Sequence, residues 1–544
     1  MSKSLDLAGK LPKRAPGSRL PAARFALLLR SGQDAQAVIA DIRSQLAPLN
    51  VEVEPLSASQ PGVLILKLPD FLMAAEPSVA FDLAHQLNDQ FNLENAEPEI
   101  FTDLLPEPDS KRQGRREESV DNFPPGCWVA EDPNLDNTPD WALQAMRVRD
   151  AWQFSSDSGH AAFGLDVIVA QPDTGITQHP ELVGITSVPG YDFVDDKQGN
   201  TDPLDYIGNP GHGTATASVL ISGSAGRVTG VAPKSKHMSI RAIESVIRVS
   251  QLSVAEAIEF AIDNKAHVIT MSRGGVPSIP LWLALRRAVE NNLIVFAAAG
   301  NCVGEVVFPA RYENCVAVAG VNAKDEPWQG TCCGPDVAIS APGENVYRAS
   351  VKRDNATGVI TFGVGQGQGT SFAVALTAGV AALWLAHHGR DKLIAFAKSK
   401  GETLQAMFRR LLRATARRPG ANWDATTMGV GIVDANALLR ADLSTSLDRE
   451  GFGLQAAGKG ADAVRRLVLA FTHSPDAAQA PINWDRFGPE IAYALFAKSR
   501  GAAPVSRDAK VSPEATQMLE HPALSPQLEA ALASAPDLAQ QLCR

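Results

Sequence analysis

The sequence contains few cysteines for its length. Its 544 residues include six of them. They are Cys127, Cys302, Cys315, Cys332, Cys333 and Cys543. None has the C-x-x-C spacing of a zinc site, and so few cysteines do not make a disulfide scaffold. We therefore interpret most of them as buried or incidental thiols.

Long apolar runs are also absent. The longest, such as "GVAALWLA", fall well short of the roughly 20 residues of a membrane-spanning helix, so we expect no membrane partner. The basic N-terminus has only "FALLL" as an apolar segment, which is too short for a signal peptide, and no small-residue cleavage site follows it. This favours the cytoplasm. Secretion by a route without such a signal, or an organelle transit peptide, remains the alternative.

A long block of basic residues is missing as well. The formal net charge is −10, which argues against nucleic acid as a partner. Apolar residues make up 45% of the chain, an ordinary share for globular proteins. The length allows roughly two to four domains.

The N-terminal part predicts a small α+β domain. Residues 1–21 are polar and basic, and we expect them to be disordered. Strand patterns follow at 24–30, 51–56, 62–68 and 96–101, and amphipathic helix patterns at 34–47 and 78–91. The order strand-helix-strand-strand-helix-strand is that of a ferredoxin-like domain, here over residues 22–105.

A linker and a larger α/β domain come next. Residues 106–125 are rich in charge and proline, which indicates an exposed, cleavable tether or else an uncut spacer. Over 126–442, apolar strand patterns alternate with helical ones. This predicts a doubly wound, mainly parallel sheet with helices on both faces. Residues 443–544 predict a helical C-terminal region of unknown role.

Four polar residues occur where this sheet would form a site, at the carboxyl ends of its strands. They are Asp173, His212, Asn301 and Ser371. Each alone has a structural explanation: an Asx-turn, a core histidine, a turn asparagine and a helix N-cap. Together on one rim they would form an acyl-transfer site of acid, base, oxyanion donor and nucleophile.

The stretches around these residues are "DTGI", "GHGTA", "AAAGN" and "GTSFA". In this order they resemble the signatures of the subtilisin-like serine peptidases, and the resemblance covers about residues 126–440. It implies a subtilisin-like fold and a serine endopeptidase that forms an acyl-enzyme. Asp173, His212 and Ser371 would be the triad, and Asn301 the oxyanion donor. The N-terminal domain resembles the family's propeptide, an intramolecular inhibitor of the zymogen.

Three departures from the family pattern suggest a divergent branch. Gln171 and Pro172 replace aliphatic residues before the acid, and Pro172 lacks the N–H of a ladder hydrogen bond. Ala215 and Thr216 stand where His and Val are common. The proline usual after the serine is missing, which predicts an ordinary first helical turn.

Substrate and ion binding follow from the same resemblance. Ser272, Arg273 and Gly274 would pair with substrate backbone as a strand. Arg273 would favour an acidic side chain upstream of the cut, unless it is a solvated residue on the rim. No cofactor is required, but an acidic loop could bind Ca²⁺, the alternative being a solvated loop. Its acids are Asp192, Asp195, Asp196, Asp202 and Asp205.

Two other functions compete with an endopeptidase acting on proteins or peptides. A catalytically silent binding module would not need all four site residues. A serine esterase is disfavoured because Ser371 has no G-x-S-x-G elbow.

Overall fold

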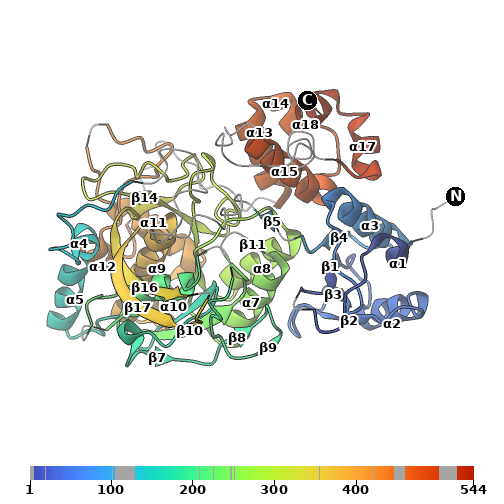
Figure 1. The fold of residues 1–544 in the computed structure, drawn as a ribbon. Helices are drawn as coiled ribbons and strands as arrows, with labels where there is room; N and C mark the ends of the chain where they lie inside the picture. Colours follow the sequence, from blue (N-terminus) through green and yellow to red (C-terminus); the bar gives the residue numbers. More distant parts are fainter. Residues whose placement is uncertain are drawn as a thin grey trace.

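The chain forms three parts that pack against one another (Figure 1). The computed structural model describes residues 5–18, 20–100, 102–103, 129–206, 209–223, 226–245, 248–249, 251–354, 356–420, 422–445, 460–501 and 523–543. We call residues 5–103 the N-terminal domain, 129–445 the central domain and 460–543 the C-terminal region. The expected linker 106–125 lies outside the described residues.

The N-terminal domain is a four-stranded antiparallel sheet with two main helices. Its elements are β1 (Ala23–Leu28), α2 (Ala35–Gln45), β2 (Glu52–Pro55), β3 (Val63–Leu68), α3 (Pro77–Gln90) and β4 (Asn95–Pro98). The strand order is β2-β3-β1-β4. Alternation along β1 sends Phe25 and Leu27 into this domain's own core and Ala26 toward the central domain. Both faces of the sheet are therefore covered.

The N-terminal stretch differs from the disorder expected for residues 1–21. Helix α1 (Leu7–Lys10) forms there. Leu7 is 2% exposed and joins Leu11 in the core of the domain. Burial of two leucines offsets the entropy of ordering a short polar segment.

The central domain is built on a nine-stranded sheet. Six parallel strands run in the order β15-β14-β13-β12-β6-β10. They are β6 (Ile168–Asp173), β10 (Lys236–Arg241), β12 (Val268–Met271), β13 (Ile294–Ala298), β14 (Val316–Val321) and β15 (Ile339–Pro342). The short strands β7 (Thr186–Ser187), β8 (Tyr191–Asp192) and β9 (Lys197–Gln198) extend the sheet beyond β10.

Helices cover both faces of this sheet, as its continuous apolar strands require. On β13, Ile294 and Phe296 face a cluster that contains α6 (His212–Ile221) and α9 (Thr370–His388). Val295 and Ala297 face the cluster with α7 (Gln251–Asp263) and α8 (Ile279–Glu290). Helix α9 is long and apolar enough to cross a membrane, but 89% of its apolar 18-residue stretch is buried inside the protein. It is the core helix of the domain.

Further elements surround this framework. They are α4 (Trp141–Ala145), α5 (Val148–Asp157), η2 (Pro180–Leu182), β16 (Val346–Arg353), β17 (Ile360–Gly367), α10 (Arg390–Ser399), α11 (Leu404–Thr415) and α12 (Ala435–Arg440). Strands β16 and β17 pair as an antiparallel hairpin.

Pro172 shapes the end of the central strand β6. Pairing with β12 stops at Ala170, whereas pairing with β10 continues to Asp173. Proline has no N–H to donate toward β12, so the ladder on that side ends first. The sheet thus opens beside Asp173.

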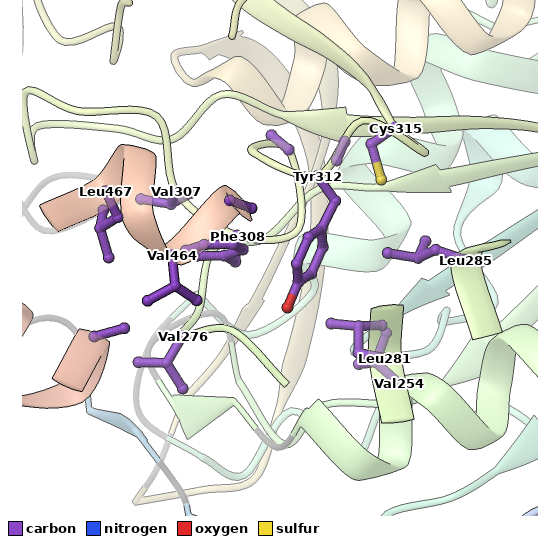
Figure 2. Close-up of a cluster of buried hydrophobic side chains, with 14 of the residues drawn as sticks. Val254, Val276, Leu281, Leu285, Val307, Phe308, Tyr312, Cys315, Val464 and Leu467 are labelled. Atoms are coloured by element: carbon purple, nitrogen blue, oxygen red, sulfur yellow. The ribbon is translucent and has the colours of Figure 1, made fainter. Parts of the chain in front are cut away.

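The C-terminal region is helical in its described parts. It contains α13 (Gly460–Thr472), α14 (Pro475–Ala478), α15 (Trp484–Gly501), α17 (Pro526–Leu532) and α18 (Pro536–Cys543). Val464 and Leu467 of α13 point toward Val307 and Phe308 of the central domain (Figure 2). These side chains share one hydrophobic cluster, so the region is docked on the central domain.

Candidate active site

Asp173 ends β6 at the opening beside β12. The residue is 1% exposed, and its carboxylate accepts a 2.7 Å hydrogen bond from the backbone N–H of Thr174. The second carboxylate oxygen lies 3.4 Å from the Thr216 hydroxyl. A buried carboxylate needs such donors, and its remaining capacity is directed at a histidine.

That histidine is His212, the first residue of α6. Its Nδ1 lies 2.8 Å from Asp173 Oδ1. The next residue, Gly213, runs so close to Gly175 that an added Cβ would lie 2.1 Å from the Gly175 carbonyl oxygen. Glycine is therefore required for α6 to begin beside the strand end. An Nδ1–H donated to Asp173 leaves Nε2 as the basic nitrogen.

Ser371 completes a chain of three side chains. His212 Nε2 lies 3.1 Å from Ser371 Oγ, although the two residues are 159 positions apart. Ser371 is the second residue of α9, whose N-cap is Gly369. The N-cap explanation of this serine is therefore wrong. Its hydroxyl is directed at an imidazole and not at the orphan amides of the helix.

Asn301 supplies the missing cap. Its Oδ1 accepts hydrogen bonds from the backbone N–H of Thr370 at 3.0 Å and from the Thr370 hydroxyl at 2.8 Å. With the oxygen held, the Nδ2 amide points away from these donors and lies beside Gly369. A Cβ on Gly369, whose φ is +146°, would lie 3.3 Å from that nitrogen. Thr370 was not singled out from the sequence, although it is part of "GTSFA".

A polar network lies behind Asp173 in place of the usual apolar core. Gln171 Nε2 donates to the Thr216 hydroxyl at 2.6 Å and to the Gly213 carbonyl at 3.0 Å. His237 Nε2 lies 2.7 Å from Gln171 Oε1. Burial lowers the pKa of His237 to about 4, so its imidazole is neutral at pH 7. Gln171 and Thr216 were visible as departures in the sequence, but His237 carried no signal.

A short strand of the central domain pairs with the N-terminal domain. Strand β5 (Thr102–Asp103) of the N-terminal domain pairs antiparallel with β11 (Arg248–Val249). Ser272, Arg273 and Gly274 follow the end of β12 and are not part of a strand. Ser272 and Ser371 contact each other twice: Ser272 Oγ donates to the Ser371 carbonyl at 3.1 Å, and Ser371 Oγ lies 3.4 Å from the Ser272 carbonyl.

Arg273 is buried, so the alternative prediction of a solvated residue on the rim is wrong. It is 3% exposed and donates from Nη2 to Gln251 Oε1 at 2.5 Å. Its Nε and Nη1 have no hydrogen-bond partner, and among the described residues no carboxylate forms an ion pair with it. Burial lowers its pKa to about 9. A buried guanidinium without a counter-charge is costly unless a ligand supplies one.

The acidic loop does not fit a calcium site. Arg241 Nη1 lies 2.9 Å from Asp192 Oδ2 and 3.0 Å from Asp195 Oδ2, and Lys197 Nζ lies 2.7 Å from Asp195. Cations of the chain therefore already neutralise the loop. The other acids contact Tyr191 (Asp196), Thr174 and Tyr206 (Asp202), and Arg353 (Asp205). No group of three metal-ligating side chains is arranged to hold an ion within the described part of the chain.

The cysteines whose side chains the structure describes are of two kinds. Cys302, which follows Asn301 directly, is disulfide-bonded, so it is not an incidental thiol. Cys315, Cys332 and Cys333 are free. Burial raises the pKa of Cys332 to about 12 and that of Cys315 further, which makes both thiols unreactive.

The comparison with protein families agrees with this geometry. The model described as "Subtilase family" matches residues 164–447. The chain belongs to the subtilase family. Members are serine-type endopeptidases. The matched residues include all four side chains assembled above, from Asp173 to Ser371.

Individual relatives are similarly informative. The subtilase is 34% identical over 253 residues to a thermostable alkaline protease of Halalkalibacterium halodurans, covering 46% of this chain and 63% of that protein. It is 32% identical over 253 residues to thermitase of Thermoactinomyces vulgaris, covering 46% of this chain and 82% of thermitase. It thus spans less than two thirds of the former relative.

A solved structure shows the same fold. Fervidolysin from Fervidobacterium pennivorans, described as a keratinolytic enzyme related to subtilisin, matches with a TM-score of 0.54 at 21% identity. The match covers 80% of this chain and 65% of fervidolysin. The subtilase therefore has a subtilisin-like α/β fold.

Proposed function

We propose that this subtilase is a serine endopeptidase that hydrolyses peptide bonds through an acyl-enzyme. The observation that carries the proposal is the continuous chain from Asp173 to His212 (2.8 Å) to Ser371 (3.1 Å). All three residues are at most 8% exposed, so the hydrogen bonds are protected from water. A binding module would not need this alignment of acid, base and nucleophile.

Each group has a defined role in the reaction. His212 Nε2 takes the proton of Ser371 Oγ as that oxygen attacks the scissile carbonyl. Asp173 holds the imidazole tautomer and stabilises the imidazolium. Asn301 Nδ2 and the Ser371 backbone N–H bind the oxyanion. His212 then gives the proton to the leaving amine, and water hydrolyses the acyl-enzyme by the same steps. This chemistry needs no organic cofactor.

The N-terminal domain would be an intramolecular inhibitor with a ferredoxin-like fold. Its strand order β2-β3-β1-β4 supports this fold. Glu97, at the end of β4, accepts a 2.9 Å hydrogen bond from the backbone N–H of Ile279 and so caps α8. The pairing of β5 with β11 supports occupation of the groove edge that a substrate strand would use. Cutting between residues 106 and 121 would release the domain.

Charged contacts strengthen this interface. Arg24 joins Glu99 of its own domain at 2.7 Å to Glu256 of α7 at 3.0 Å. Ser57 and Ser59 donate to Glu259 and Asp263 of the same helix, both at 3.1 Å. The N-terminal domain therefore follows the whole length of α7.

Specificity would come in part from the segment Ser272 to Gly274 and from Arg273. The unpartnered Nε and Nη1 of Arg273 support the hypothesis that it favours an acidic substrate side chain upstream of the cut. A substrate carboxylate would supply the counter-charge that this guanidinium lacks.

The disulfide at Cys302 bears on the location of the protein. Stable disulfides persist mainly in oxidising compartments. We therefore propose an oxidising compartment, such as that of a secreted protein, in place of the cytoplasm.

Two assays test the proposed activity. The purified chain should be labelled by a fluorophosphonate and should digest casein, and Ser371→Ala should abolish both. Labelling without digestion would favour an esterase. The absence of both labelling and digestion would favour a silent binding module. Intact mass with and without Ser371→Ala tests self-processing, because only the active chain should lose its N-terminal domain. Equal masses would contradict self-processing.

A further inference from the structure

The C-terminal region is fixed to the central domain by apolar and charged contacts. Val464 and Leu467 share one hydrophobic cluster with Val307 and Phe308 (Figure 2). Arg466 donates from Nε to Asp336 at 3.1 Å and from Nη2 to the Arg311 carbonyl at 2.9 Å. The region is thus docked on the central domain by both kinds of contact.

Its other side contacts the N-terminal domain. In Figure 1, α15 and α17 lie next to α3 and β4. Arg486 donates to both carboxylate oxygens of Asp89, at 2.8 and 3.0 Å. Asn95 Nδ2 donates to the Asp485 carbonyl at 3.0 Å. Gln527 Nε2 donates to Asp82 at 2.8 Å.

The centre of this contact is buried. His85 Nε2 lies 3.2 Å from Glu490 Oε2, and the two side chains are 1% and 3% exposed. The ring of Phe487 meets the His85 ring edge-on at 5.1 Å. Glu490 also accepts from the backbone N–H and hydroxyl of Ser525 at 2.6 and 2.8 Å, which ties the start of α17 to the same point. The buried side chains of His85 and Glu490 are thus paired across the two parts.

The N-terminal domain is therefore held on two sides. Its sheet face lies on α7 and α8, and its helix α3 lies on α15 and α17. Phe81, Pro98, Val276 and Pro489 line one small cavity where the three parts meet. A domain bound at two linked surfaces dissociates only when both contacts are released together.

We propose that the C-terminal region is a binding surface for the N-terminal domain that keeps this domain on the groove after the linker has been cut. This inference rests on the proposed function, in which the N-terminal domain inhibits the peptidase. The partner is the cleaved N-terminal domain itself. It is recognised through three side chains of α3, the acidic Asp82 and Asp89 and the buried His85. Activation then requires loss of the C-terminal contact as well as cleavage.

The test uses the full chain with Ser371→Ala and with a recognition sequence for a site-specific protease placed in residues 106–125. After cutting, native mass spectrometry and gel filtration follow the release of the N-terminal domain. Arg486→Asp sets two like charges against each other at Asp89, and we expect release about tenfold faster than in the parent chain. Arg486→Asp combined with Asp89→Arg restores the opposite charges and should restore slow release.

Two more variants complete the experiment. Arg465→Asp changes a 47% exposed arginine that pairs within α13 with Asp462, and it should leave release unchanged. Glu490→Ala removes the buried partner of His85 and should release the domain faster than Arg486→Asp. Equal release rates in the parent, Arg486→Asp and Glu490→Ala chains would overturn the proposal.

A parallel measurement separates this proposal from the proposed function. The same cut chain with Ser371 intact is assayed on a fluorogenic peptide. Full activity while the N-terminal domain stays bound would refute inhibition and leave the binding surface standing. Activity that rises in step with release, and faster in Arg486→Asp, would support both.

Discussion

The side-chain amide of Gln171 donates a 2.6 Å hydrogen bond to the hydroxyl of Thr216, and this hydroxyl lies 3.4 Å from Asp173 Oδ2. The same hydroxyl lies 3.0 Å from the His212 carbonyl. Thr216 therefore contacts both the side chain of Asp173 and the backbone of His212. Together with His237, these residues form a buried polar support for Asp173, and we regard Thr216 as a positioning residue.

Replacing Thr216 with valine keeps the shape of the side chain but removes its hydrogen bonds. We expect kcat to fall about 5- to 10-fold, since one such bond contributes about 1 kcal/mol, while KM stays unchanged. Steady-state kinetics on a peptide substrate measure both values. Thr377→Val is the matched control, because Thr377 is equally buried and donates to the Ala373 carbonyl within α9. An equal loss in both variants would indicate a general effect of buried threonines.

Asn301 and Thr370 should affect turnover to different degrees. Removal of the corresponding amide in a subtilisin costs about 10²–10³ in kcat, and we expect the same for Asn301→Ala. Thr370→Val removes one of the two hydrogen bonds that orient Asn301 and should cost about 5-fold. The double variant should be no slower than Asn301→Ala alone. Additive losses would show that Thr370 acts independently of Asn301.

The hold on the N-terminal domain should weaken as pH rises. Burial raises the pKa of Glu97 from 4.5 to about 7, although the Ile279 N–H opposes this shift. Between about pH 4.5 and 7, the carboxyl group of Glu97 is therefore protonated in the bound domain and ionised in the released domain. Binding should be tightest below about pH 4.5 and should weaken as pH rises through about 7. Burial also raises the pKa of Glu256 to about 7, which adds to the same pH dependence.

Release of the cut domain in the Ser371→Ala chain, followed between pH 4.5 and 8, measures this effect. Glu97→Gln keeps an oxygen for Ile279 but does not titrate, so its release should depend less on pH. Glu94→Gln is the control, since its side chain is 53% exposed and lies in the same domain. A Glu97→Gln profile as steep as the parent profile would exclude Glu97 as the titrating group.

Arg273→Leu should change cleavage preference. A leucine fills the space but cannot pair with a carboxylate, so any preference for acidic side chains upstream of the cut should disappear. Profiling of both chains on a peptide library measures the effect. An acidic preference that survives the substitution would mean that Arg273 is only a structural partner of Gln251.

The disulfide of Cys302 should stabilise the loop that carries Asn301. Native disulfides typically contribute about 2–4 kcal/mol, so Cys302→Ser should lower the melting temperature by several degrees. Thermal unfolding of the two chains measures this. Cys333→Ser is the control, because Cys333 is a free, half-buried thiol. An unchanged intact mass on reduction would contradict the bond itself.

Local sequence determined much of this protein. Apolar strands such as Ile294–Ala298 can only be buried on both faces, which requires a parallel sheet between helices. Turn residues at the ends of β6 and β13 placed Asp173 and Asn301 at one rim. The order of the four motifs indicated the family and the candidate triad, because each motif is short and contains its own geometry.

The tertiary structure decided what depends on residues far apart in the chain. Ser371 alone has the features of a helix cap, but Asn301 takes that task from another strand and leaves the hydroxyl to His212. Arg273 is buried because Gln251 reaches it from α7. Arg241 neutralises the acidic loop. Helix α15 contacts α3, although the two helices lie near opposite ends of the sequence. Such contacts follow from packing, and no local pattern of residues encodes them.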